Sequence, residues 1–155
     1  MTRYAELQVT SPFSFLRGAS SAEALFATAA ALGIKALAVT DRNSLAGIVR
    51  AWQAAKDTGV RLIVGCRLDL ACGMALLAYP TDRAAYARLC RLLTLGKSRA
   101  GKGKCQLDWS DLADYAEGMI AVLVPDLADD NCALRLRRLR DLFGAVSYTH
   151  LTLPT

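Results

Sequence analysis

The chain has 155 residues, of which 54% are hydrophobic, and its formal net charge is +5. This length and apolar content support one folded domain with its own core and exclude a disordered chain. The sequence holds no apolar run of about eighteen residues, and its first residues lack the apolar segment of a signal peptide. We therefore expect a cytoplasmic protein with no membrane span. The small basic excess permits a polyanionic partner without requiring one.

Five cysteines and one histidine limit the metal chemistry of the chain. No two cysteines have the C-x-x-C spacing of zinc fingers and ribbons, which argues against such a site. In a reducing cytosol we interpret all five, at positions 66, 72, 90, 105 and 132, as small buried side chains. His150 is the only histidine in the sequence, so no mechanism within this chain can use a histidine pair or cluster.

The first half of the chain alternates short apolar runs with helical segments. The apolar runs predict strands of the buried parallel type. Ser20 and Glu23 have the spacing of a capping box, which predicts the start of the first helix. The predicted elements are, in order, a strand at 5–9, a helix from Ser20 to Gly33, a strand at 35–40, a helix that ends at Gly59 and a strand at 61–65.

The second half is predicted to hold a strand pair, three helices and one more strand. The pair should turn at Cys72 and Gly73. The other predicted elements are, in order, a helix at 82–95, a glycine-rich basic loop at 96–104, a short helix from Asp108 or Ser110 to Tyr115, a strand at 119–124 and a helix at 129–143. Alternating strands and helices favour an α/β fold with a mainly parallel sheet flanked by helices.

Polar residues follow three of the predicted strands directly. Function in α/β folds gathers at the carboxyl ends of the strands. Here those ends carry Gln8 with Thr10, the Thr-Asp-Arg run at 40–42, and the Gly-Cys-Arg run at 65–67. We therefore expect these three strand ends to line one pocket.

Three stretches, in order along the chain, resemble the first three motifs of the PHP (polymerase and histidinol phosphatase) domain. They read YAELQVTSPFSFLRGAS, ALAVTDRNSLAGIVRAW and LIVGCRLDLA. The chain looks most like the N-terminal PHP domain of bacterial error-prone DNA polymerases, over about residues 3–145. The resemblance implies that residues 1–145 form the N-terminal part of a PHP-type distorted β/α barrel, with mainly parallel strands flanked by helices.

The last residues, 146–155, fit such a domain poorly. They predict neither a helix nor a strand with a clear partner. Two explanations stay open. The first is a truncation point, followed by a tail that is foreign to the original gene. The second is a genuine terminal strand.

The resemblance also implies a degenerate metal site. Metal-binding members of the family carry His-x-His, Thr-Asp-His and Gly-Cys-Glu in the three motifs, and these residues help hold metal ions for phosphoester hydrolysis. Here the histidines fall on Gln8, Thr10 and Arg42, the glutamate falls on Arg67, and Asp41 remains. Gln and Thr are poor ligands for transition metals, and each arginine places a positive charge where a cation would sit. We therefore expect no bound metal and no catalytic residue in this chain.

Two structural roles for Asp41 are open. Its side chain could cap the helix that begins near Ser44. It could instead pair with Arg42, Arg67 or Arg17, so that an internal ion pair replaces the metal. We favour a structural role over catalysis, because no second acid or base is in view.

The basic loop at 96–104 matches a phosphate-binding loop only in part. Gly96, Gly101 and Lys102 fit G-x-x-x-x-G-K, but Gly103 stands where a Ser or Thr should bind Mg²⁺, and the loop follows a helix rather than a strand. We therefore reject a nucleotide site. Contact with the DNA backbone and plain solvent exposure remain the alternatives. The candidate contact residues are Lys97, Arg99, Lys102 and Lys104.

The resemblance implies that the intact protein is a DNA-directed DNA polymerase, a nucleotidyltransferase that uses Mg²⁺ to copy DNA past damage. The acidic residues for that step lie in a palm domain that this chain lacks. The chain itself would be a scaffold that packs against the remaining polymerase domains, and DNA would be the partner of the parent protein. Two alternatives are a stand-alone PHP-type metal-dependent phosphoesterase and a DNA-binding remnant.

Overall fold

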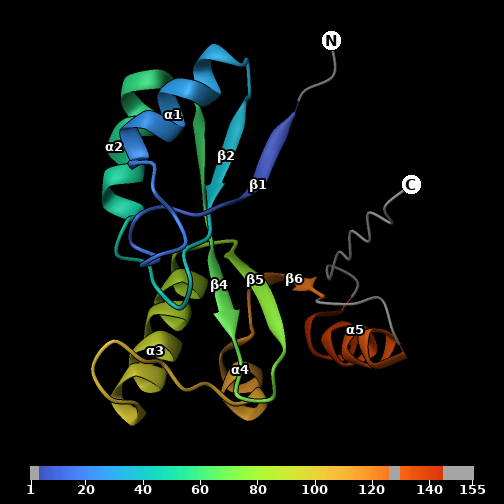
Figure 1. Ribbon diagram of the computed structural model, residues 1–155. Coiled ribbons are helices and arrows are strands. Elements are labelled where there is room, and N and C mark those ends of the chain that lie inside the picture. Colours follow the sequence, from blue (N-terminus) through green and yellow to red (C-terminus); the bar gives the residue numbers. More distant parts are fainter. Residues whose placement is uncertain (1–3, 126–129, 145–155) are drawn as a thin grey trace. The chain divides into compact units, whose positions relative to one another are not determined.

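The computed structural model describes residues 4–125 and 130–144 (Figure 1). The chain divides into two compact units, Met1–Arg67 and Leu68–Thr155, and each is described here by itself. The predicted tail at 146–155 lies outside the described residues. Every strand and helix predicted from the sequence has a counterpart in the structure.

The first unit is a three-stranded parallel sheet with two helices. The strands β1 (Ala5–Val9), β2 (Ala36–Val39) and β3 (Arg61–Val64) lie in the order β1-β2-β3. The helices α1 (Ala22–Ala31) and α2 (Ile48–Thr58) connect them and lie side by side (Figure 1). Because successive strands run parallel, both strand-to-loop transitions at 9–11 and 39–42 fall at one edge of the sheet.

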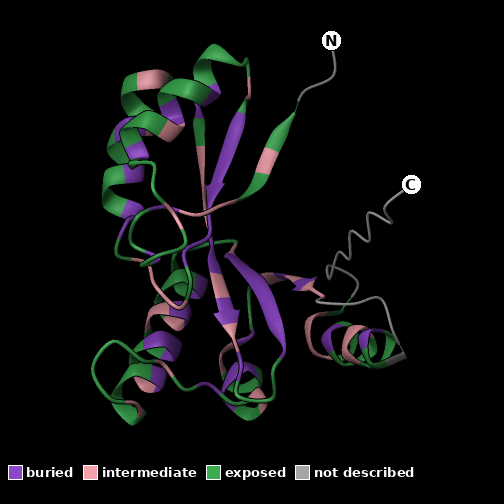
Figure 2. Cartoon of the chain, viewed as in Figure 1, coloured by how far each residue is buried: buried purple, intermediate pink, exposed green. Residues whose placement is uncertain are grey.

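The core of this unit explains why the central strand reads as an uninterrupted apolar run. All four residues of β2 are buried (Figure 2), as expected for a strand that has neighbours on both sides. Phe26 from α1 packs with Leu37 and Val39 of this strand, and the small side chains of Ala51 and Ala54 let α2 approach closely.

The helix ends follow the glycine signals, while one predicted start is shifted. Gly59 is the C-cap of α2, with a φ of 72°, and Gly33 follows α1 with a φ of 73°. Such left-handed backbone favours glycine. The N-cap of α1 is Ser21 rather than Ser20, because the Ser21 hydroxyl accepts a hydrogen bond from the backbone N–H of Ala24 at 3.3 Å. Two adjacent serines offered the same chemistry, and the sequence pattern selected the wrong one.

The second unit contains a three-stranded sheet in the order β4-β5-β6. Its strands are β4 (Cys66–Asp69), which spans the boundary between the units, β5 (Ala75–Pro80) and β6 (Met119–Val124). The expected turn of the strand pair is present, with Gly73 at a φ of 78°. The predicted parallel arrangement describes the first sheet, whereas β5 and β6 pair antiparallel. Two helices connect these strands, so the alternation of elements did not decide their direction.

The helix α3 (Arg83–Arg99) is longer than its predicted range. The predicted basic loop at 96–104 is wrong for its first four residues, which are helical. A side chain at Gly96 would come within 2.6 Å of Leu107 and 2.7 Å of the Cys105 sulfur. This glycine is therefore a site of close packing inside a helix and does not end the helix.

The short helix α4 (Trp109–Tyr115) is capped by a reciprocal pair of aspartates. Asp108 is the N-cap, and Asp111 accepts a hydrogen bond from the Asp108 backbone N–H at 2.9 Å. Asp111 also accepts from the Arg99 guanidinium at 2.6 Å, which ties the end of α3 to the start of α4. After β6 comes the last helix, α5 (Asp130–Phe143). Within the described ranges, none of the helices is long and apolar enough to cross a bilayer.

We call the pair of hydrogen bonds that Asp111 accepts, from Asp108 and Arg99, the Asp111 clamp, and it predicts a pH-dependent stability. The pKa of the Asp111 carboxyl lies below its ordinary value. The hydrogen bond from the Asp108 backbone N–H lowers it most, and the hydrogen bond from Arg99 is the next contribution. A carboxyl with a lowered pKa stabilises the fold above its unfolded pKa, and this stabilisation is lost as the pH falls. We expect Asp111→Ala to lower the free energy of unfolding by about 1–2 kcal/mol at neutral pH, and by less in acid, in urea titrations.

The exposed Asp114, on the same helix, provides the control. Asp114→Ala should leave the free energy of unfolding nearly unchanged at both pH values. An equal loss for the two variants would contradict the proposed clamp.

Candidate functional site

The structure brings the predicted site residues together at the carboxyl ends of the first sheet. Gln8 lies in β1 and Thr10 follows it, while Asp41 and Arg42 follow β2. Arg42 forms an isolated parallel bridge with Arg67. The Arg67 N–H donates to the Asp41 carbonyl at 3.1 Å, and the Asn43 N–H donates to the Arg67 carbonyl at 2.7 Å. The structure therefore places Asp41, Arg42 and Arg67 next to one another, and the pocket predicted at the three strand ends stays a prediction.

Asp41 is the buried centre of this arrangement. The residue is only 1% exposed to solvent. One carboxylate oxygen, Oδ1, accepts from the Ser11 backbone N–H at 2.8 Å and from the Ser14 hydroxyl at 2.7 Å. The other, Oδ2, accepts from the Ser11 hydroxyl at 2.6 Å. A buried charge is tolerated when such short, charge-assisted hydrogen bonds replace its hydration.

Neither predicted role of Asp41 is correct. The following helix begins at Ile48, with Gly47 as its N-cap and no side-chain cap. In the part of the chain that the structure describes, the Asp41 carboxylate bonds to Ser11 and Ser14 and to no arginine. Hydroxyl and backbone N–H donors, rather than guanidinium groups, therefore balance this carboxylate.

The two serines extend the contact from Asp41 into the loop between β1 and α1. The Ser14 hydroxyl also accepts from the Arg42 backbone N–H at 2.9 Å, and the Ser11 hydroxyl accepts from the Phe13 N–H at 3.2 Å. Each hydroxyl thus donates to Asp41 and accepts from the backbone. We name this group of three side chains, Ser11, Ser14 and Asp41, the Asp41 clasp.

Two glycines allow the loop to close over the Asp41 clasp. A side chain at Gly18 would come within 2.7 Å of the Thr10 carbonyl oxygen and closer still to that of Ser11. A side chain at Gly47 would lie 3.1 Å from both Asp41 Oδ2 and the Ser11 hydroxyl oxygen. Larger residues at these positions would displace the backbone or the clasp.

The predicted exposure of the cysteines is correct in part. Cys66 and Cys132 are buried, Cys90 and Cys105 are half-buried, and Cys72 is exposed. All five are free thiols. The Cys66 thiol lies against the site, where it donates to the Asp41 carbonyl oxygen at 3.3 Å.

The donor set does not fit a transition metal. Among the described residues, no group of three or more His, Cys, Asp or Glu side chains is placed to hold a metal ion. Both oxygens of Asp41 already accept hydrogen bonds within the clasp. The neighbouring side chains at the family's ligand positions are an amide, a hydroxyl and two guanidiniums, and the last two are never metal ligands. No reaction step through a metal follows from these residues.

The predicted DNA-contact residues lie in the second unit. Lys97 and Arg99 are on α3, and Lys102 and Lys104 are in the turn that follows it. All four are exposed. Arg99 is engaged by Asp111, which hydrogen-bonds and pairs with its guanidinium and raises its pKa. The lysines are therefore better placed than Arg99 to meet an external anion.

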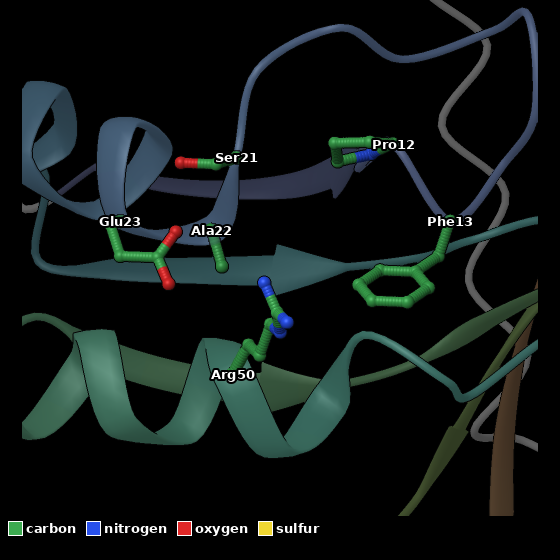
Figure 3. A pocket seen from close by; sticks show the side chains of 6 residues that line it. All are labelled: Pro12, Phe13, Ser21, Ala22, Glu23 and Arg50. Atoms are coloured by element: carbon green, nitrogen blue, oxygen red, sulfur yellow. The ribbon is translucent and has the colours of Figure 1, made fainter.

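A small pocket of about 160 Å³ opens beside the loop between β1 and α1 (Figure 3). Arg50 extends from α2 toward the ring of Phe13, and its guanidinium carbon lies 6.0 Å from the ring centroid. The remaining lining residues are Pro12, Ser21, Ala22 and Glu23. The pKa of the Glu23 carboxyl is lowered, first by its own backbone N–H, then by Ser21 and last by the charge of Arg50.

The family model of the PHP domain matches residues 6–149. The chain belongs to the PHP domain family. Its curated relatives include error-prone DNA polymerase 3 of Agrobacterium fabrum, at 65% identity, and error-prone DNA polymerase 2 of Rhizobium meliloti, also at 65%. Each alignment covers 97% of this chain and 14% of the relative. An error-prone DNA polymerase of Caulobacter vibrioides is 55% identical over 91% of the chain and 13% of the relative. The chain thus spans about a seventh of these relatives.

Solved structures agree in fold at much lower identity. An amidohydrolase from Chromobacterium violaceum, solved with bound sulfate and no metal, has a TM-score of 0.62 at 19% identity, over 94% of this chain and 75% of that one. The lesion-specific endonuclease PfuEndoQ from Pyrococcus furiosus has a TM-score of 0.59 at 13% identity, over 97% of this chain and 42% of that one. The predicted PHP-type α/β fold is confirmed.

The Asp41 clasp predicts a strong and graded loss of stability. Asp41→Ala would leave one buried N–H and two buried hydroxyls without their acceptor, and we expect the free energy of unfolding to fall by about 3 kcal/mol. Asp41→Asn keeps one acceptor oxygen and an amide that can donate to Ser11, so its loss should be smaller. Urea unfolding followed by circular dichroism measures both.

A matched aspartate serves as the control for this series. Asp57 is exposed on α2 and accepts from the Gln53 amide at 3.0 Å. Asp57→Ala should cost no more than a few tenths of a kcal/mol. If Asp41→Ala and Asp57→Ala had similar effects, the clasp would not be a main support of the loop.

Proposed function

We propose that this chain is the N-terminal PHP module of an error-prone, translesion DNA polymerase, and that it acts as a structural scaffold rather than as a catalyst. The observation that carries the proposal is the 65% identity across 97% of the chain to relatives named error-prone DNA polymerase, of which the chain covers 14%. The hydrogen bonds that engage both oxygens of Asp41 support the scaffold role.

The proposal assigns DNA synthesis to parts of the parent protein outside this chain. Nucleotidyl transfer with Mg²⁺ would take place there, on DNA in the cytoplasm, during replication and repair past damage. Residues 1–145 would form the incomplete PHP barrel, and 146–155 would be a tail that follows a truncation point. The module would contact the remaining polymerase domains and hold its own loops in place through the Asp41 clasp.

A direct contact with the DNA backbone is the second part of the proposal. Lys97, Lys102 and Lys104 are exposed at the end of α3 and in the following turn. Their charges would attract phosphates in a salt-dependent manner. Arg99 contributes less, because Asp111 holds its guanidinium.

A stand-alone phosphoesterase is the alternative that the residues favour less. Its chemistry requires ligands that place metal ions beside a phosphate. The positions that would supply them hold Gln8, Thr10, Arg42 and Arg67. The shared fold supports the alternative only at the level of architecture.

The gene itself provides the first test. We expect the source DNA, sequenced across and beyond the codons for residues 140–155, to continue in the original frame into the rest of a PHP barrel and then a polymerase palm. A gene in which the frame stops after the codon for Thr155 would refute the polymerase module and leave a free-standing PHP protein.

Metal content and hydrolysis separate the scaffold from the phosphoesterase. The purified chain should contain far less than one zinc, manganese or iron per molecule after incubation with each metal, as measured by elemental mass spectrometry. It should not hydrolyse a phosphodiester or shorten a DNA 3′ end. Stoichiometric metal together with hydrolysis that a chelator abolishes would establish the enzyme instead.

A further inference from the structure

The loop between β1 and α1 presents two large apolar side chains to solvent. Phe15 is 84% exposed and Leu16 is 89% exposed. They occupy the middle of a turn that closes where the Arg17 N–H donates to the Ser14 carbonyl at 2.9 Å. Isolated exposed apolar residues are ordinary, but two adjacent ones at the tip of a loop form an apolar patch that the core of this unit does not cover.

This tip is held in place rather than free to collapse onto the surface. Ser14, at the start of the turn, is buried, and its hydroxyl bonds to Asp41 and to the Arg42 backbone. Gly18, at the end of the turn, also donates to the Ser14 carbonyl, at 3.3 Å. Leu16 has a φ of 60°, a left-handed conformation that is unfavourable for a leucine. The Asp41 clasp thus displays Phe15 and Leu16 in a strained, defined position.

Two exposed arginines belong to this part of the first unit. Arg17 directly follows Leu16, and Arg50 lies over the ring of Phe13 beside the pocket (Figure 3). Within the described residues, neither guanidinium has a carboxylate close enough for an ion pair. Glu23 is the one acid among the residues that line the pocket. The tip therefore combines the exposed ring of Phe15 with the charge of Arg17, and the pocket combines the ring of Phe13 with the charge of Arg50.

We infer that the tip of this loop binds single-stranded DNA, with Phe15 stacking on an unpaired base and Arg17 and Arg50 contacting the adjacent phosphates. Aromatic side chains next to positive charges are the combination that binds single strands with little sequence preference, because every base offers a face for stacking. Phe13 and the pocket beside it would receive the neighbouring nucleotide. The inference rests on the proposed function for its choice of DNA as the partner.

Binding of a fluorescein-labelled oligothymidylate to the full 155-residue chain, followed by fluorescence anisotropy, tests this inference. We expect binding that weakens with salt and that exceeds binding to a duplex of equal length. Phe15→Ala should weaken it by about tenfold, because one stacked base is lost. Arg17→Gln should weaken it and lower the slope against the logarithm of salt concentration by about one.

Two exposed residues at the opposite end of the first sheet supply matched controls. Leu32, which follows α1, is 71% exposed, and Arg61 begins β3 and is exposed. Leu32→Ala and Arg61→Gln should bind the oligonucleotide as the unchanged chain does. All four variants alter exposed side chains, and thermal melting by circular dichroism verifies that each is folded.

Several outcomes would overturn the inference. These are absence of binding by the unchanged chain, equal affinity for single strand and duplex, or normal binding by Phe15→Ala. Loss of binding in a Lys97→Gln, Lys102→Gln, Lys104→Gln variant, with none in Phe15→Ala, would place the DNA on the second unit instead. None of these results bears on the continuation of the reading frame, so the polymerase module can stand when the loop contact fails.

Discussion

The carboxylate of Asp41 is the interaction on which the rest of the site depends. A negative charge buried at the end of β2 requires a compensating partner. For metal-binding members of the PHP family, the resemblance implies a metal ion near this point. Here three hydrogen bonds from Ser11 and Ser14 take that place. They join the carboxyl ends of β1 and β2 and fix the loop that follows β1, in which Gly18 lies against the Ser11 carbonyl, while Gly47 lies against Asp41. The contacts that engage both oxygens of Asp41 thereby maintain the order of the site.

Much of the fold could be predicted because local signals and global topology agree. The apolar run of β2 and the glycines after α1 and α2 each mark a boundary that the structure retains. The errors arose where a local signal had two interpretations. Ser20 and Ser21 are both good caps, and only the backbone path selects Ser21. Gly96 suggests a helix end, yet its neighbours Cys105 and Leu107 require a residue without a side chain inside α3.

The candidate site was also predictable only in part. The positions Gln8, Thr10, Asp41, Arg42 and Arg67 could be found in the sequence, because parallel strands bring their carboxyl ends together. The partners of Asp41 could not, since Ser11 and Ser14 lie about thirty residues away in a loop, and serines in loops are common. The one available signal was chemical. A buried aspartate that lacks a cation needs hydrogen-bond donors nearby, and the two serines in the loop after β1 are small residues that can donate.

A loop that is held by serine hydroxyls differs from a loop that is held by a bound metal ion in what its conformation requires from outside the chain. A loop organised by a bound ion loses its order when that ion is scarce or chelated, so its structure follows the supply of the metal. The clasp of Ser11, Ser14 and Asp41 is made entirely of groups that the chain carries with it. The contacts that hold this loop are therefore contained within the first unit of the chain, between Ser11, Ser14 and Asp41.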